Sequence, residues 1–594
     1  MRNYFTLGLI ATVVSLLVAG APVARGQDVF DVIPADSWGF FAAPNMNATG
    51  DHIQNFFTGF AFPGMPHTDD LVGETLEELD FGPGVNRDGG LAFVMLDPSD
   101  FGVNVGKLAG EAAAGQVDEV PDLPLVIIIA AEDVKAAFGD AEMKEEGGFT
   151  AVTINDDVLC AKTHKGYVIA SKLPAAVDAV INATASAKTK LGAKKIAMMS
   201  KSAFALQVNF CEFADQVGPV LDALEFKIAE DSPAEMASYM STVMDMYRTL
   251  LPQMSQVTFC GAMEANGVRI AGSIDFVPDS PIGKAYAALG PISSDKLMSF
   301  VDAGSYIMAM EAINFQAPGI DQQNLLSSMW KPLFKDEKLR DSLTSALVDF
   351  SKETTAAQFV IQSLPANGVG LFNIAYIIKC NDSAKVTASM EQFAGCLQQI
   401  AAESGIPDLA MLKITYAKAV ETVEGASVDA VQFDHPMLQG PGAMFLGPVL
   451  GELTPRFTVT AVGKDTVVIS LGGGSAMLGN IIKQVVANDG KLMQQADMKD
   501  VVAQMPSKPI SVLLISPANL TSTVSRAMAM FGAGGVQFTP TSQTPIAIAA
   551  GVDGPSQTLM LYVPTAPLKE MINFFMTVQG GGSQAPAPVD TEDF

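Results

Sequence analysis

Basic residues are scarce in this 594-residue chain, which carries 36 Lys and Arg against 64 Asp and Glu and has a formal net charge of −28. Such a polyanion repels the phosphate backbones of nucleic acids, and no stretch gathers Lys and Arg into a basic stripe. The densest basic patch, around Lys194 and Lys195, is interpreted as the solvated face of a loop-to-helix connection. The sequence therefore predicts no nucleic-acid partner and little affinity for anionic lipid.

Long apolar runs are also rare, and the one that stands out is Phe5–Val18, preceded by Arg2. Ala24-Arg25-Gly26 follows as a small-x-small sequence, so the segment is typical of a cleaved signal peptide. It is too short for a comfortable membrane span of about 20 residues, although an uncleaved anchor stays open as an alternative. We expect residues 1–26 to be removed, no integral membrane span afterwards, and a location in the periplasm or outside the cell.

Cysteine is sparse and odd in number, with five in the chain. An odd number in an exported protein leaves at least one thiol free or paired between chains, and five are too few for a disulfide scaffold of this length. Cys211 and Cys260 lie at the ends of alternating strands, and the second half of the chain has no counterpart of either, so we predict a disulfide between them. Cys380 and Cys396 form a second possible pair, which leaves Cys160 over.

Catalytic and metal-binding signatures are missing. The four His form no H-E-x-x-H, and the chain has no G-x-S-x-G, no Cys–His context and no EF-hand spacing. The nearest metal-like set, Asp51-His52 with His67, Asp69 and Asp70, is loop-like and is better explained by ordinary polar roles. Nothing in the sequence identifies a catalytic residue, a metal ligand or a cofactor site, which favours a non-enzymatic role.

Glycines gather at Ser470–Ser475, after a predicted strand and before a predicted helix. That context suits phosphate binding at a helix N-terminus. However, Met477 holds the place of the third glycine of a G-x-G-x-x-G pattern, and no Walker lysine follows. We therefore interpret the segment as a tight strand-to-helix turn.

What the chain does contain is an internal duplication, because several stretches recur in the same order. The clearest pair reads aromatic-Val-Pro-x-x-Pro-aliphatic. The matched stretches are 276–282 with 562–568, 204–210 with 510–516, 167–171 with 467–471, 126–131 with 374–379, and Ser37-Trp38 with Ser305-Tyr306. We expect a first copy over residues 27–290, a second over 291–579, and a flexible tail over 580–594, rich in Gly, Ala and Pro.

Each copy is predicted to combine eight or nine short strands with four to six helices. Two- or three-residue turns such as His164–Gly166 and Gly463–Asp465 require antiparallel neighbours. An amphipathic helix is predicted over Pro233–Leu251. The expected fold is α+β, with two tandem copies of a mostly antiparallel twisted sheet and helices packed on a face.

Methionine is abundant, with 30 residues. Met fills irregular gaps in cores, and it is also common where a surface must accommodate varied apolar partners. An ordinary loosely specified core is one interpretation. The other is an apolar groove between sheet and helices that binds lipid or another hydrophobic molecule.

The predicted mature start, Val32-Ile33-Pro34-Ala35-Asp36-Ser37 leading into an aromatic strand, resembles the opening of uncharacterised exported bacterial proteins of the domain-of-unknown-function type, which begin with a Pro-Ala-Asp strand. The resemblance implies an exported bacterial protein with repeated strand–helix units, and it assigns no functional residue.

Three functional hypotheses follow. The favoured one is an exported, non-enzymatic binding or scaffold protein whose partner is a hydrophobic small molecule or another protein. The second is a structural component of the envelope or of an extracellular assembly. The third is an enzyme with a site between the two copies, which fold alone does not exclude.

Overall fold

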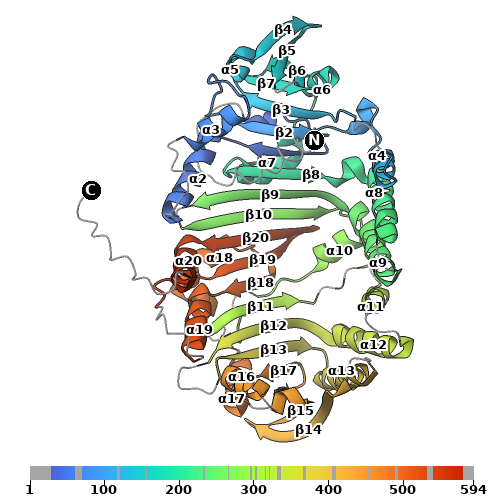
Figure 1. Cartoon of the computed structure of the whole chain (residues 1–594), viewed down its shortest axis with the longest axis vertical. Coiled ribbons are helices and arrows are strands. Elements are labelled where there is room, and N and C mark those ends of the chain that lie inside the picture. Colours follow the sequence, from blue (N-terminus) through green and yellow to red (C-terminus); the bar gives the residue numbers. More distant parts are fainter. Residues whose placement is uncertain are drawn as a thin grey trace, which may run out of the picture. The chain divides into compact units, whose positions relative to one another are not determined.

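The computed structural model describes residues 28–60, 70–116, 121–154, 157–231, 234–264, 266–293, 297–301, 304–314, 316, 318–319, 321–330, 336–364, 370–403, 410–439, 441–452, 455–488, 492–530 and 539–579. Contacts divide the chain into two compact units (Figure 1). Unit 1 holds the described residues within 1–289, 317–320 and 552–561. Unit 2 holds those within 290–316, 321–551 and 562–594.

Unit 1 contains ten antiparallel strands. They are β1 (Gly39–Ala43), β2 (Leu91–Met95), β3 (Leu125–Ala130), β4 (Glu142–Glu146), β5 (Phe149–Ile154), β6 (Asp157–His164), β7 (Tyr167–Ser171), β8 (Phe204–Asn209), β9 (Met254–Glu264) and β10 (Gly267–Phe276). Their order across the sheet is β4-β5-β6-β7-β3-β2-β1-β8-β9-β10. The turn between β6 and β7 uses positive φ at Lys165 and Gly166, as a tight hairpin requires.

The helices of unit 1 are α2 (Met46–Phe60), α3 (Leu71–Glu78), α4 (Val105–Ala113), α5 (Val134–Phe138), α6 (Pro174–Ile181), α7 (Ala187–Met199), α8 (Phe210–Asp231), α9 (Ala234–Leu250) and α10 (Pro281–Ala288). The amphipathic helix predicted over Pro233–Leu251 is confirmed as α9. In Figure 1, α4, α8 and α9 lie beyond one end of the strands and not across their middle.

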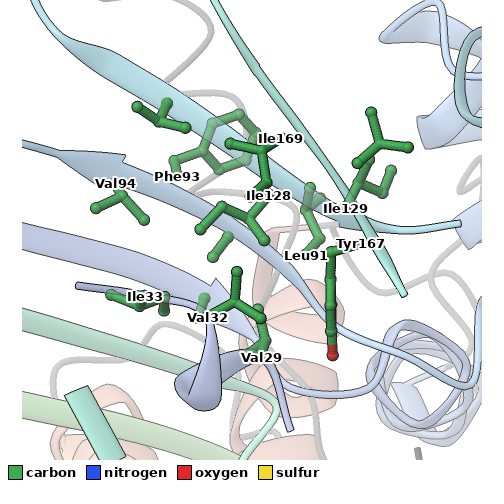
Figure 2. Close-up of a cluster of buried hydrophobic side chains, with 14 of the residues drawn as sticks. Val29, Val32, Ile33, Leu91, Phe93, Val94, Ile128, Ile129, Tyr167 and Ile169 are labelled. Carbon is green, nitrogen blue, oxygen red and sulfur yellow. The ribbon is translucent and has the colours of Figure 1, made fainter. Parts of the chain in front are cut away.

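The core of unit 1 forms where η1 (Val29–Asp31) packs on the sheet. Figure 2 shows Val29, Val32 and Ile33 against side chains from β2, β3 and β7. Asp28 caps η1 by accepting a hydrogen bond from Phe30 N at 3.2 Å.

The Pro-Ala-Asp segment that follows η1 does not form a strand. Pro34 makes only an isolated bridge to Ser186, its carbonyl accepts from Ser37 Oγ at 3.1 Å, and β1 begins at Gly39. Proline has no N–H to donate to a sheet, so this segment turns before the strand starts.

Unit 2 contains eight whole strands and parts of β19 and β20, whose residues 552–561 belong to unit 1. The strands are β11 (Tyr306–Ile313), β12 (Thr354–Ser363), β13 (Phe372–Cys380), β14 (Lys413–Val423), β15 (Ala426–Asp434), β16 (Arg456–Ala461), β17 (Thr466–Leu471), β18 (Pro509–Ile515), β19 (Ile546–Asp553) and β20 (Ser556–Pro564). Nine of them are ordered β14-β15-β16-β17-β13-β12-β11-β18-β19, with every pair antiparallel.

The helices of unit 2 are α11 (Gln322–Trp330), α12 (Glu337–Glu353), α13 (Ser383–Glu403), α15 (Pro436–Gln439), α16 (Pro441–Leu450), α17 (Gly474–Ala487), α18 (Lys499–Gln504), α19 (Pro517–Met530) and α20 (Thr565–Gln579), with 3-10 turns η4 (Leu492–Gln494) and η5 (Ala496–Met498). Helix α17 packs on one face of the sheet through Leu478, Ile481 and Ile482. Helix α13 packs on the opposite face, against the strands around β14, β16 and β17.

The α+β class and the mostly antiparallel pairing are therefore confirmed. The strand count was too low, since the described residues form 20 strands. Within the described part of the chain, no helix combines the length and the apolar character needed to cross a membrane.

Candidate functional site

The two faces of the unit 2 sheet differ in a way that is unusual for a globular sheet. On one face, here called the covered face, the side chains are buried, and small and polar residues lie there among apolar ones such as Leu514, Ile377 and Val468. Its central members are Ala309, Glu311, Gln358, Val360, Gln362, Asn373, Ala375, Ser470, Val512, Leu514, Ala547 and Ala549. Helix α17 and residues around Phe300 lie on this side.

The other face, here called the open face, carries the bulky apolar side chains, and these stay partly exposed. Its members are Met308, Met310, Phe359, Ile361, Ile374, Tyr376, Ile469, Leu513, Ile515, Ile546 and Ile548. Met310 is 37% exposed and Ile548 is 45% exposed. Half-buried sheets normally turn their polar residues to water and their large apolar residues inward. This sheet departs from that pattern, because it buries Glu311, Gln358, Gln362 and Asn373 while large apolar residues of the other face stay partly exposed.

Register aligns the open-face residues in two rows across the strands. One row runs Ile548–Leu513–Met310–Phe359–Tyr376–Ile469. The second runs Ile546–Ile515–Met308–Ile361–Ile374. Six strands spaced by about 4.8 Å make the first row roughly 24 Å long. Helix α13 packs against Tyr376 and Ile469, so the row is most exposed over β11, β18 and β19.

Unit 1 has a similar arrangement over β8, β9 and β10. Its open face carries Phe41, Phe204, Leu206, Val208, Val257, Phe259 and Ile274, all partly exposed, and Leu206 is 37% exposed. Register again joins them in rows, for example Phe259–Leu206–Phe41–Phe93–Ile127. Its covered face buries Ala205, Gln207, Asn209, Thr258, Ser273 and Asp275 over β8, β9 and β10, and Phe40, Val94, Val126 and Ile128 over β1, β2 and β3.

Glycines in unit 1 make room for the aromatic rings of this face. A Cβ on Gly261 would lie 2.0 Å from Cε1 of Phe204, and a Cβ on Gly272 would lie 2.6 Å from Cδ1 of Phe259. Each ring therefore lies flat over a glycine of the neighbouring strand. Phe41 also stacks on Phe204, with 6.0 Å between ring centroids.

Several buried polar groups of the unit 1 covered face are bonded to one another and to α7, whereas the hydroxyls of Thr258 and Ser273 have no hydrogen-bond partner among the described residues. Asp275 accepts from Gln256 Nε2 at 2.7 Å and forms an ion pair with Lys195. Asn209 accepts from Gln207 and donates from Nδ2 to Ser37 O at 2.6 Å. These contacts let amide and carboxylate side chains be buried on the face that a helix covers.

The basic patch lies mostly on α7, where Lys190 and Lys194 are exposed and Lys188 and Lys195 are half-buried. Lys188 pairs with Asp31 at 2.7 Å, Lys190 with Glu212 at 2.6 Å and Lys194 with Asp553 at 2.5 Å. Together with Lys195 they fasten α7 to segments of unit 1 that are distant in sequence.

The covered face of unit 2 holds the buried carboxyl of Glu311. It accepts a hydrogen bond from Met298 N at 2.5 Å and lies beside Gln358 on the neighbouring strand. Burial raises the pKa of the Glu311 carboxyl, and the hydrogen bonds from Met298 and Gln358 oppose that rise without cancelling it.

The predicted cysteine pair is not brought together. Register places Cys260, which is buried, opposite Ala205 in β8, whereas the exposed Cys211 lies beyond the other end of β8, in the first turn of α8. All five cysteines have free thiols in this structure, and Cys396 Sγ lies 3.3 Å from Ser342 Oγ. A Cys211–Cys260 disulfide stays a prediction, and it would require β8 and β9 to leave this register.

The glycine-rich segment forms the predicted tight turn between β17 and α17. Gly472, Gly473 and Gly474 all have positive φ, and a Cβ on Gly472 would lie 2.9 Å from Phe372 O. Asn373 Nδ2 donates to Gly472 O at 2.7 Å. Backbone conformation and close packing therefore account for these glycines.

The loose metal-like set is only partly described. Asp70 caps α3 and forms an ion pair with Arg87 at 2.7 Å, and that bond lowers the pKa of Asp70. His67, Asp69 and the side chain of His52 lie outside the described residues. In the part of the chain that the structure describes, no three His, Cys, Asp or Glu side chains gather as metal ligands would.

Comparisons with protein-family models, with curated proteins and with solved structures find no match to this chain. Function is therefore inferred from the geometry of its own residues. The open faces of the two units were not predicted from the sequence. A signal for them exists in β8, where Gln207 and Asn209 alternate with Leu206 and Val208, but the pattern does not say which side the helices cover.

Proposed function

We propose that this chain is an exported, non-enzymatic binding protein that holds hydrophobic ligands against the open faces of its two units. The observation that carries the proposal is the arrangement of side chains on the two faces of the sheet. Bulky aliphatic and aromatic side chains stay partly exposed while amide and carboxylate side chains are buried behind them. Exposed apolar surface of this extent is costly in water, and it normally marks a place where something apolar binds.

The proposal includes the internal duplication. The order β4-β5-β6-β7-β3-β2-β1-β8-β9 of unit 1 has the same pattern as β14-β15-β16-β17-β13-β12-β11-β18-β19 of unit 2. Three of the five recurring sequence stretches fall on strands that occupy corresponding places in the two orders: β3 with β13, β7 with β17 and β8 with β18. Both copies have kept an open face on corresponding strands, as a surface used by a shared activity would be kept.

The occupant that fits best is an acyl chain or a similar narrow apolar molecule. The open face of unit 2 is only two or three side-chain rows deep along the strands, but it crosses about six strands. Such a surface suits a long, thin ligand better than a broad protein surface. Met308 and Met310 lie near the middle of the open face of unit 2, and flexible thioether side chains adapt to ligands of varied shape. Each CH₂ buried there contributes about 0.8 kcal/mol.

The proposed location is the periplasm or the cell exterior, because of the signal-peptide pattern in residues 1–26. A protein that carries apolar molecules through an aqueous compartment has no need of a catalytic constellation or a membrane span.

The experiment is native mass spectrometry with organic extraction on protein exported and purified without detergent, followed by titration with N-phenyl-1-naphthylamine. This neutral probe fluoresces when it enters apolar surroundings. We expect a co-purifying hydrophobic species and at least two probe sites. The double variant Leu206→Gln with Met310→Gln places one amide on each open face and should weaken probe binding about tenfold, equivalent to about 1.4 kcal/mol per site.

The matched control is Leu224→Gln with Met437→Gln. Leu224 and Met437 are 49% and 66% exposed, lie on α8 and α15, and do not belong to an open face. Equal binding by both double variants, or a clean apo mass with no probe binding, would reject the hydrophobic-ligand role. A scaffold that binds protein partners, or a structural envelope component, would then be the better hypothesis.

A further inference from the structure

A polar hollow lies in unit 2, away from the open face. It has a volume of about 360 Å³, at the small end of ligand sites. Its walls come from four segments: the start of β11, the junction of β18 and α19, the 3-10 turns η4 and η5, and Gln543.

The floor of the hollow is held by hydrogen bonds between β11 and α19. Ser516 N donates to Ile307 O at 2.8 Å, and Asn519 Nδ2 donates to Tyr306 O at 2.8 Å. The buried side chains of Leu492 and Met498 anchor the two 3-10 turns on the other side. The walls are thus fixed by the fold and do not depend on an occupant.

Asp497 is the one charged side chain in the lining. It is exposed and forms no ion pair with any residue that the structure describes. No Lys or Arg lines the hollow to compensate it, and the chain as a whole carries a net charge of −28. The electrostatic potential at this site therefore favours a cation.

Tyr306 supplies the second polar group. The residue is buried and lines the hollow. Burial and the nearby negative charge of Asp497 raise the pKa of the Tyr306 phenol, so it stays neutral and can accept a hydrogen bond from a donor beside Asp497. The side-chain carbonyl oxygens of Gln495 and Gln543 add further acceptors.

We propose that this hollow binds a small organic amine, whose ammonium group pairs with Asp497 and donates to the Tyr306 hydroxyl. One carboxylate surrounded by neutral acceptors, with no basic residue in the lining, is the complement of an ammonium group that donates three hydrogen bonds. The site is separate from the open face, so it can exist whether or not the hydrophobic-ligand function holds.

The test is isothermal titration of the full chain with ethanolamine, cadaverine and D-glucosamine, each beside a neutral analogue: ethylene glycol, 1-pentanol and D-glucose. We expect at least one amine to bind at least tenfold more tightly than its analogue, and added salt to weaken that binding. Asp497→Asn should abolish the preference, and Tyr306→Phe should weaken the amine about threefold to tenfold.

The control is Asp500→Asn, which removes the same charge from an exposed position three residues away that does not line the hollow. Asp497 is itself exposed, so its substitution should leave folding intact, which circular dichroism would verify. The proposal is overturned if no amine binds with a Kd below about 10 mM, if the neutral analogues bind equally well, or if the Asp497 and Asp500 variants behave alike.

Discussion

Neighbouring leucines in β18 give the sharpest test of the open face. Leu513 belongs to the open face and Leu514 to the covered face, where it is 0% exposed. They are the same residue type, in the same strand, one position apart. Replacing each in turn by Ala therefore changes the same atoms and the same strand propensity, and only the surroundings differ.

The expected costs differ several-fold. Leu514→Ala leaves a cavity in a closed interior between β18 and its covering segments, and such changes cost about 2–5 kcal/mol. Leu513→Ala removes a side chain that water already reaches, and the site can fill with solvent. We expect about 1 kcal/mol for it, a fraction of the 1.5–3 kcal/mol that full burial of a Leu contributes.

The assay can report on unit 2 alone, because the chain has two Trp, of which Trp38 lies in unit 1 and Trp330 in unit 2. In a Trp38→Phe background, urea unfolding followed by Trp330 fluorescence gives the free energy of unfolding of each variant. Equal losses for the two leucines, or a larger loss for Leu513, would mean that the open face is as closed as the covered one, and the reasoning from it would fail.

Three further predictions concern other contacts. Lys195→Met leaves the buried carboxylate of Asp275 without its cation and should lower the free energy of unfolding of unit 1 by about 2–4 kcal/mol. Lys194→Met changes a side chain that is 88% exposed and should lower it by under about 1 kcal/mol. Similar losses for the two variants, measured by urea unfolding followed by Trp38 fluorescence, would contradict this prediction. The pKa of the Glu311 carboxyl is raised in the folded state, so its contribution to stability is fully present below its ordinary pKa of 4.5 and is lost as pH rises through the folded-state pKa. The variant Glu311→Gln should therefore become more stable relative to wild type between pH 4 and pH 8. Parallel curves of unfolding free energy against pH for the two proteins would refute this prediction. Gly472 has φ +85° and lies close to Phe372 O, so Gly472→Ala should lower the free energy of unfolding by about 2–3 kcal/mol. Gly425 has φ +80° and open space around it, so Gly425→Ala should lower it by about 1 kcal/mol. Equal losses of thermal stability would show that the close approach of Gly472 to Phe372 is unimportant.

Local signals in the sequence predicted much of the fold. Turn residues such as Lys165-Gly166 define hairpins without reference to the rest of the chain, and the Met-rich stripe of α9 has a clear helical period. Strand β4 carries no such local signal, because its sequence, Glu-Met-Lys-Glu-Glu, has one apolar residue. It forms through pairing with β5, which no local propensity reveals.

The open faces could not be predicted for a different reason. Alternation in Phe204–Asn209 separates two sets of side chains, and hydrophobicity alone would turn Leu206 inward and Gln207 outward. The structure has them the other way round, because α7 brings Lys195 to Asp275 over a sequence separation of 80 residues and covers the polar side. Which face is buried is a tertiary property, and a period of two leaves it undetermined.

The end strand of each sheet order has a further consequence. In unit 1 that strand is β4, whose Glu142, Glu145 and Glu146 side chains are exposed. In unit 2 it is β14, whose pairing with β15 is interrupted between Ala417 and Glu421, and Lys418 in this interruption is exposed. Charged side chains and irregular backbone at a terminal strand discourage a strand from another molecule from adding to it. A chain that leaves apolar side chains uncovered would otherwise be at risk of cross-β polymerisation, and at these two strands that route to fibrils is blocked.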